Sequence, residues 1–193
     1  MQTVKPKSYS FKERLEFSEE GEILCIEFLN AFSETFKENC IVTSNQNESN
    51  YRTCTDAHLM NNPDIKIEFK IDSYKSMNHY IERYSQVYKD GRKKIGGPWQ
   101  YLDKAEYYIV YYIQLKSIYI FKMKDLHKKM EELIADGTLD GQESFVRQSH
   151  ADYQSMGYKV HKSLLKDIEY EFLSIDMNES FFTTTGDRRQ IDF

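Results

Sequence analysis

The sequence predicts a mixed α/β fold, in which helices cover the faces of a mixed β-sheet. Two observations support this prediction: short strand-like segments joined by turns fill the first half of the chain, and helical periodicity occurs before and after them. A chain of 193 residues suffices for one domain, which can bury about 70% of its unfolded surface. We therefore expect a single domain over residues 18–175, with an N-terminal arm over 1–17 and a C-terminal tail over 176–193.

The first predicted elements are a helix and two short strands. Ser18 is a favourable N-cap, the acidic residues after it suit a first helical turn, and apolar residues then recur at helical spacing, which predicts a helix over 18–37. Residues 40–44 are rich in β-branched side chains and predict a strand. Residues 51–60 predict a second strand, after the turn-forming run 44–50.

The clearest strand covers residues 64–72, where apolar and charged residues alternate. Successive side chains of a strand point to opposite faces of its sheet. Glu68 and Lys70 therefore stand side by side on the charged face, and the apolar face is expected to be buried.

The second half of the chain predicts further strands and one helix. Residues 106–115 and 118–123 are expected to be strands, of which the first contains the longest apolar run, and residues 125–135 are expected to form a helix. The polar segment 138–157 is expected to be a long loop, with order returning over 159–172. Residues 74–88 carry both helical spacing and the Tyr, Ile and Val content of a strand, so both alternatives stay open.

The composition excludes several functional classes. The net charge is −5, so the chain is not a strongly basic coat protein for nucleic acid, although a local basic patch is compatible with this value. No apolar stretch is long enough to span a membrane, and the N-terminus lacks the apolar centre of a signal peptide. Three widely spaced cysteines without a CxxC pair predict reduced thiols. We therefore expect a protein of the cytoplasm without a membrane partner.

One candidate site follows from pairing the second and third strands. If they pair through the turn at 61–63, Asp56 comes close to Glu68. Two carboxylates that meet in this way repel each other, and a divalent cation relieves the repulsion; Mg²⁺, with Mn²⁺ as a substitute, prefers such oxygen ligands. Lys70 could then orient or deprotonate a metal-bound water for phosphodiester hydrolysis. The alternative is a charged, solvent-exposed strand face stabilised by cross-strand pairs.

These residues and the order of the elements resemble the PD-(D/E)xK nuclease superfamily, whose restriction-endonuclease-like fold has an αβββ-x-β core. Asp56 followed by Glu68-Phe69-Lys70 is similar to the motif of that superfamily. The segment GEILCIEFL resembles an opening helix found in several of its branches, whose glutamate, here Glu22, reaches the metal site. The alternative for Glu22 is a glutamate favoured near a helix start by the helix dipole. The resemblance covers about residues 18–133.

A later part of the chain extends the resemblance. Residues 78–113 are similar to a pattern in nucleases of phages and restriction systems, where an aromatic strand containing Ile-Glu precedes a glycine-bearing loop with Trp. This favours a strand over 78–87 and adds Glu82 as a further candidate. One departure is that Thr55, rather than proline, precedes Asp56. A Pro-Asp pair does end at Asp64, only four residues before Glu68, so Asp64 remains an alternative to Asp56.

The resemblance implies Mg²⁺-dependent hydrolysis of DNA that leaves 5′-phosphate ends. In that interpretation Asp56, Glu68 and the backbone carbonyl of Phe69 hold the metal, Lys70 positions the water and Glu22 completes the acidic site. A second hypothesis is a non-catalytic nucleic-acid-binding or interaction protein on the same fold. A homodimer is left open as the assembly.

Two further segments suggest binding partners. The glycine-containing segment 89–97 carries four basic residues that could contact DNA phosphates beside the metal site; the alternative is a solvated turn. These residues are Lys89, Arg92, Lys93 and Lys94. The C-terminus, from Gln190 to Phe193, weakly resembles a peptide that binds a sliding clamp, and an ordinary tail is the alternative.

Overall fold

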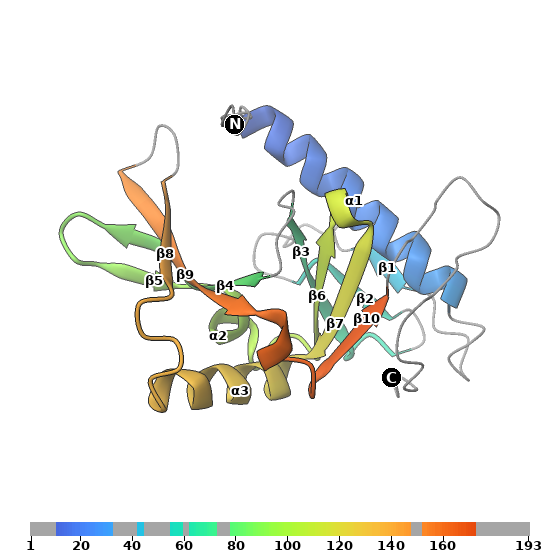
Figure 1. Cartoon of the computed structure of the whole chain (residues 1–193). Helices are drawn as coiled ribbons and strands as arrows, with labels where there is room; N and C mark the ends of the chain where they lie inside the picture. The colour runs from blue at the N-terminus through green and yellow to red at the C-terminus, as the bar shows by residue number, and fades with distance from the viewer. Residues whose placement is uncertain are drawn as a thin grey trace, which may run out of the picture.

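The structure is a computed structural model that describes residues 11–32, 42–44, 55–59, 62–72, 78–147 and 152–172. Three α-helices and two β-sheets make up this part of the chain (Figure 1). The predicted mixed α/β class is confirmed.

The two sheets have different sizes. The main sheet has six strands in the order β1 (Val42–Ser44), β2 (Ala57–Leu59), β3 (Lys66–Asp72), β6 (Tyr107–Tyr112), β7 (Ser117–Lys122) and β10 (Glu169–Phe172). The small sheet has four strands in the order β5 (Lys93–Ile95), β4 (Asn78–Tyr88), β9 (Tyr153–His161) and β8 (Glu143–Arg147). The helices are α1 (Phe11–Phe32), α2 (Gly97–Tyr101) and α3 (Met123–Ala135), and the short 3₁₀ turns are η2 (Ile113–Leu115) and η3 (Lys162–Leu164).

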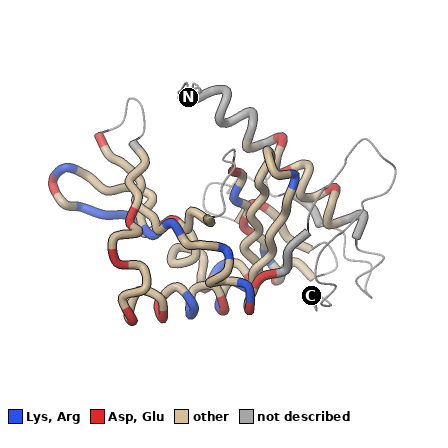
Figure 2. Tube along the Cα trace, viewed as in Figure 1, with Lys and Arg blue, Asp and Glu red and all other residues tan. Residues whose placement is uncertain are grey.

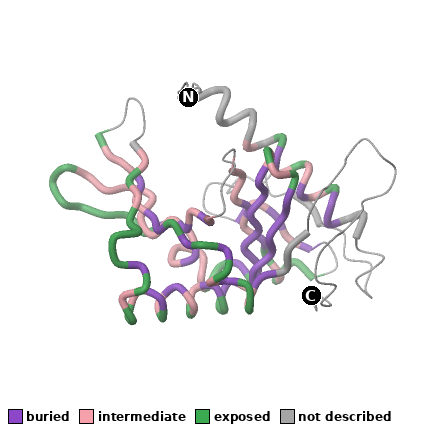
Figure 3. The backbone as a smooth tube through the Cα atoms, viewed as in Figure 1, coloured by how far each residue is buried: buried purple, intermediate pink, exposed green. Residues whose placement is uncertain are grey.

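The main sheet is mixed because β3 and β6 run parallel, whereas its other neighbouring strands are antiparallel. All six residues of β6 are buried, as the apolar run predicted. A strand that is covered on both faces has no solvated side and therefore needs no alternation of polar residues. Figure 3 shows the central strands of this sheet as buried.

One face of the main sheet packs against α1. Cys25, Phe28 and Leu29 of this helix join a core that includes Ile67 and Phe69 of β3. The helix crosses β3 closely at Gly21, where an added Cβ would lie 2.6 Å from an atom of the Ile71 side chain. Any larger residue at this position would have to push the helix or the Ile71 side chain aside.

The first helix begins earlier than the sequence suggested. It starts at Phe11, so the predicted start at Ser18 was wrong, and residues 11–17 belong to this helix. These residues contain no glycine or proline, so nothing in them opposes helix formation. Ser18 does not cap the helix; its hydroxyl donates a hydrogen bond of 3.2 Å to Oε1 of Glu22, one turn further on.

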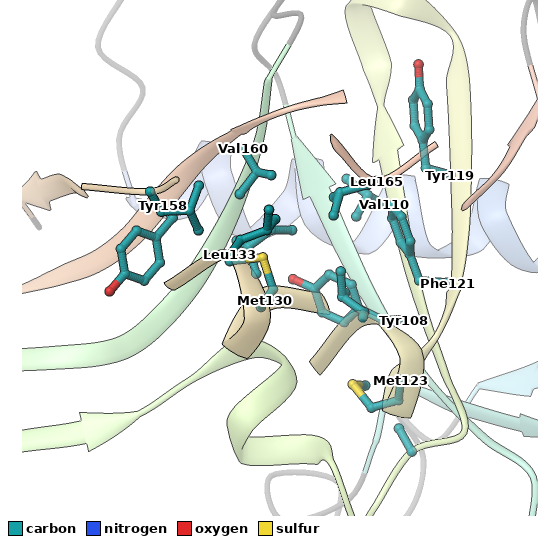
Figure 4. Close-up of a cluster of buried hydrophobic side chains, with 14 of the residues drawn as sticks. Tyr108, Val110, Tyr119, Phe121, Met123, Met130, Leu133, Tyr158, Val160 and Leu165 are labelled. Atoms are coloured by element: carbon teal, nitrogen blue, oxygen red, sulfur yellow. The ribbon is translucent and has the colours of Figure 1, made fainter. Parts of the chain in front are cut away.

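The opposite face of the main sheet, α3 and the small sheet enclose a second core, which Figure 4 shows in close-up. Tyr108 and Phe121 of the main sheet meet Leu126 and Met130 of α3 there, and Tyr158 of β9 lies in the same cluster. The small sheet thus uses one face to cover the main sheet and α3.

The segment 138–157 was predicted as a loop, and this was wrong for residues 143–147 and 153–157, which are strands. Residues Glu143–Arg147 form β8, which pairs antiparallel with β9. This hairpin buries only part of its surface, and Phe145 remains 54% exposed, so its polar composition reflects a solvated strand. A sheet with one solvated face carries fewer apolar residues than a buried one.

Most other predicted elements are confirmed with shifted ends. For residues 74–88 the sequence left helix and strand open; the described part, Asn78–Tyr88, is a strand. The third strand begins at Lys66, and α3 begins at Met123, two residues before its predicted start. Residues 1–10, 33–41, 45–54, 60–61, 73–77, 148–151 and 173–193 lie outside the described residues, and with them the start of the arm and the C-terminal tail with Gln190 and Phe193. Within the described helices, none has the length and apolarity required to cross a membrane.

Candidate active site

Asp56 lies directly before β2, next to the middle of β3. The antiparallel pairing of β2 with β3 sets Ala57 opposite Ile67, and the backbone N–H of Phe69 donates a 2.8 Å hydrogen bond to Oδ2 of Asp56. Burial raises the pKa of Asp56 to about 7, opposed by this hydrogen bond, and the charge of Glu22 raises it further. Asp56 is thus held against the backbone of the residue that follows Glu68.

Glu68 lies in the middle of β3, and burial is the largest influence on its ionisation. Burial and the charge of Asp56 raise the pKa of Glu68 to about 9, although a hydrogen bond from Tyr101 and the charge of Lys70 act in the opposite direction. Oε2 of Glu68 is buried and has no hydrogen-bond partner. A buried acceptor without a partner is rare in folded proteins and indicates a place for a missing ligand.

Glu22 supplies a third carboxylate from α1. Its charge raises the pKa of both Asp56 and Glu68, so the helix brings this residue into the same electrostatic group. The buried thiol of Cys25, one turn further along α1, also has a raised pKa, chiefly through burial and then through Glu22. The acidic group therefore joins the helix, the start of β2 and the middle of β3.

Lys70 lies between two acidic residues from different sheets. Its charge lowers the pKa of Glu68 and that of Glu82, which lies on β4. Burial nevertheless leaves the pKa of Glu82 raised, and Ser155 of β9 hydrogen-bonds to this carboxyl. Lys70 and Glu82 thus connect the acidic group to the small sheet.

The glycine pair at the start of α2 allows the chain to pass close to Glu82. Gly97 has a φ of +47°, and an added Cβ would collide with the carbonyl oxygen of Glu82. At Gly96 an added Cβ would lie 2.7 Å from Oε1 of the same residue. Only glycine fits these two positions without displacing Glu82.

Sequence reasoning missed Tyr101 and Tyr108. Tyr101 closes the short helix α2 and hydrogen-bonds to Glu68, and burial together with the charges of Glu68 and Asp56 raises its pKa. Tyr108 is fully buried on β6 in direct register with Glu68. The available signal for Tyr101 was its place just after Gly-Gly-Pro-Trp, but a helix of five residues leaves no periodic pattern that would orient it.

The candidate residues fit a divalent cation that keeps part of its water shell. The charges of Asp56, Glu22 and Lys70 all act on Glu68. A bound cation would offset the repulsion between the three carboxylates and would give Oε2 of Glu68 a partner. Among the described residues, no group of three or more His, Cys, Asp and Glu side chains is arranged as a ligand set. Two carboxylates, one backbone carbonyl and water are a donor set typical of Mg²⁺, which needs few protein ligands.

Asp64, the sequence alternative to Asp56, lies elsewhere. It is exposed in the turn between β2 and β3, where the backbone N–H of Ile65 donates to the carbonyl of Asn62. Its charge is not among those that act on Glu68, whereas the charge of Asp56 is. The structure thus brings Asp56 rather than Asp64 to Glu68.

The four basic candidates lie on the β4–β5 hairpin, which continues from Glu82 and the glycines that pack against it. Lys89 and Arg92 flank the turn, and Lys93 and Lys94 belong to β5; all four are exposed (Figures 2 and 3). The register with β9 sets Tyr88, at the end of β4, about 13 Å from Glu82, because their partners Tyr153 and Gly157 are four residues apart. Gly96 and Gly97 pack against Glu82, and the basic residues extend from there along the hairpin, so their contact with DNA phosphates stays a prediction.

The chain was compared with protein-family models, curated proteins and solved structures. No family model, curated protein or solved structure matches this chain.

Proposed function

We propose that this protein is a metal-dependent deoxyribonuclease of the PD-(D/E)xK type that hydrolyses DNA phosphodiester bonds with Mg²⁺. The observation that carries the proposal is the half-buried pair Asp56 and Glu68 beside Lys70, with Oε2 of Glu68 lacking a partner. The topology supports it, because a helix, three antiparallel strands and a fourth strand parallel to the third correspond to the αβββ-x-β core.

In this proposal the two carboxylates and the backbone carbonyl of Phe69 hold the cation. Bound there, Mg²⁺ would stabilise the charge that develops on the phosphoryl oxygens during hydrolysis. Asp56 is fixed by the N–H of Phe69, and Glu68 is oriented by the hydroxyl of Tyr101. Both ligands are thus positioned before substrate arrives, which reduces the reorganisation needed for reaction.

Lys70 orients the attacking water. It lies on the same face of β3 as Glu68, and its charge interacts with both Glu68 and Glu82. Carboxylates on two sides restrict where the ammonium group can lie, so that Nζ can hold a water against the phosphorus. Glu82 is therefore a positioning residue for Lys70, and Glu22 adds negative charge that favours cation binding.

A non-catalytic nucleic-acid-binding protein is the second candidate. The exposed basic hairpin favours it, because those residues can contact phosphates without any metal chemistry. The two candidates differ in whether DNA is cut.

The test is cleavage of plasmid and branched DNA in Mg²⁺, Mn²⁺ or EDTA by the parent protein, Glu68→Gln and Glu106→Gln. Glu106 is exposed at the start of β6 and serves as the matched control. We expect metal-dependent cleavage by the parent and by Glu106→Gln, and none by Glu68→Gln. Cleavage by all three proteins, or by none with either metal, would contradict the proposal.

A further inference from the structure

The two faces of the small sheet have different environments. Tyr158 and Val160 of β9 are buried in the core shared with α3, and Met156 packs against it. The alternate residues of β9, Tyr153 and Ser155, therefore face away from this core. This second face is the outer face of the small sheet.

The outer face leads from the acidic group to the basic hairpin. Residues paired directly across antiparallel strands share a face, and the register pairs Glu82 with Gly157 and Tyr88 with Tyr153. Ser155, between these two pairs on β9, hydrogen-bonds to Glu82. Tyr80, on the same face, covers Gly157 and hydrogen-bonds to Ser155, which is only 3% exposed, so Tyr80 forms the surface of this face between Glu82 and the two tyrosines. Four residues of β9 separate Gly157 from Tyr153, so a strip about 13 Å long begins at the proposed catalytic centre and ends at two tyrosines.

The far end of the strip combines aromatic rings with positive charge. The rings of Tyr88 and Tyr153 lie 5.6 Å apart, and the guanidinium of Arg92 lies 4.7 Å from the Tyr88 ring centroid. The hydroxyl of Tyr88 donates to Oε1 of Gln86, whose partner across the hairpin is Lys94. Lys94 therefore shares this face with the aromatic pair.

Lys93 belongs to the opposite face. Its ammonium group lies 4.9 Å from the centroid of the Tyr84 ring, and Tyr84 pairs with Met156, which packs against the core. Adjacent lysines of β5 thus point to opposite sides of the sheet. This difference offers an internal control for any function of the outer face.

We propose that the outer face of the small sheet binds single-stranded DNA and leads it to the catalytic centre. Aromatic and guanidinium planes stack on base faces, which are accessible in an unpaired strand and covered in a duplex. The neighbouring Lys94 contacts the phosphates of the same strand. This inference rests on the proposed nuclease function for its choice of DNA, and it names a single-stranded segment as the substrate class.

The experiment measures binding in EDTA, where no cleavage is expected, of a labelled oligothymidylate and of a duplex of equal length. We expect Tyr88→Leu and Tyr153→Leu each to weaken oligothymidylate binding by about 5- to 150-fold, as for the loss of one stacked base. Duplex affinity should stay unchanged. Phe145→Leu is the control, since Phe145 is exposed on the opposite face of the same sheet.

A second set of variants avoids any dependence on buried packing. Lys93 and Lys94 are both exposed, so neither alanine variant should unfold the protein. Lys94→Ala should weaken oligothymidylate binding more than Lys93→Ala. Equal effects of the two variants, or equal losses on duplex and single strand in the tyrosine variants, would overturn the inference.

Failure of this inference can be told apart from failure of the proposed function. Metal-dependent cleavage by the parent, with oligothymidylate affinity unaffected by Tyr88→Leu, would overturn the stacking surface alone. Selective loss of oligothymidylate binding in Tyr88→Leu would support the surface even if the parent cut no DNA, and the nuclease proposal would then fall.

Discussion

Replacing Glu68 by glutamine should stabilise the metal-free protein at neutral and alkaline pH. Burial and the charge of Asp56 raise the pKa of Glu68 from its ordinary 4.5 to about 9. Between these two values the folded protein holds a proton that the unfolded chain has released. The free energy of unfolding of the parent is therefore highest below about pH 4.5 and falls as the pH rises toward 9.

The size of this effect follows from proton linkage. One proton held only by the folded state lowers the free energy of unfolding by about 1.4 kcal/mol for each unit of pH. From about pH 5 to about pH 8 the parent should thus lose at most about 4 kcal/mol through Glu68. Asp56, whose pKa is raised to about 7, contributes with the same sign up to that pH. Domains are stable by only about 5–15 kcal/mol, so the loss is measurable.

The assay is denaturant unfolding across this pH range in EDTA, with the parent, Glu68→Gln and the exposed control Glu106→Gln. Stability of the parent and of Glu106→Gln should fall as the pH rises, and the fall should be smaller for Glu68→Gln. At about pH 8, Glu68→Gln should be the most stable of the three, and added Mn²⁺ should stabilise the parent much more than this variant. If the free energy of unfolding depends on pH in the same way for the parent and Glu68→Gln, the inference that the pKa of Glu68 is raised in the folded protein is refuted.

Three further predictions concern neighbouring groups. Lys70→Met should still bind Mn²⁺ by calorimetry, while the rate of single-turnover cleavage falls by about 10²- to 10⁴-fold. The control is Lys66→Met, at an exposed position of the same strand, which should cut DNA like the parent. If Lys70→Met loses metal binding together with turnover, the role of Lys70 is structural. Tyr101→Phe removes a hydrogen bond that lowers the pKa of Glu68, so the pH–rate profile should move to higher pH, and an unmoved profile would exclude this role. Changing residues 92–94 to alanine should flatten the salt dependence of duplex binding by up to about 0.9 per lost phosphate contact, whereas an unaltered slope would place the phosphate contacts elsewhere.

The main parts of the candidate site could be predicted because they depend on local rules. Alternation along the third strand sets Glu68 and Lys70 on one face, and that rule holds whatever the strand packs against. A short turn between two strands makes antiparallel pairing the simplest arrangement, and that pairing brings Asp56 to Phe69. Neither inference required knowledge of the other elements.

The remaining features depend on contacts between distant segments. β4 belongs to the small sheet although it follows β3 of the main sheet in the chain. No local pattern in residues 78–88 indicates which of the two sheets this strand joins. The position of Tyr101 next to Glu68 depends on the close approach of Gly97 to the backbone of Glu82 on β4. The β8–β9 hairpin is polar because one of its faces is solvated. The start of α1 was misplaced because Ser18 is equally compatible with an N-cap and with a helix interior in which it bonds to Glu22.

The central claim is that Asp56 and Glu68 hold one divalent cation at the place where DNA is cut. The most direct measurement is a crystal structure of the protein soaked in Mn²⁺, with anomalous scattering used to locate the metal. The account predicts one strong peak between the carboxylates of Asp56 and Glu68, beside the carbonyl of Phe69, and its loss in crystals of Glu68→Gln. A peak only at exposed carboxylates such as Asp64, or no peak at all, would contradict it.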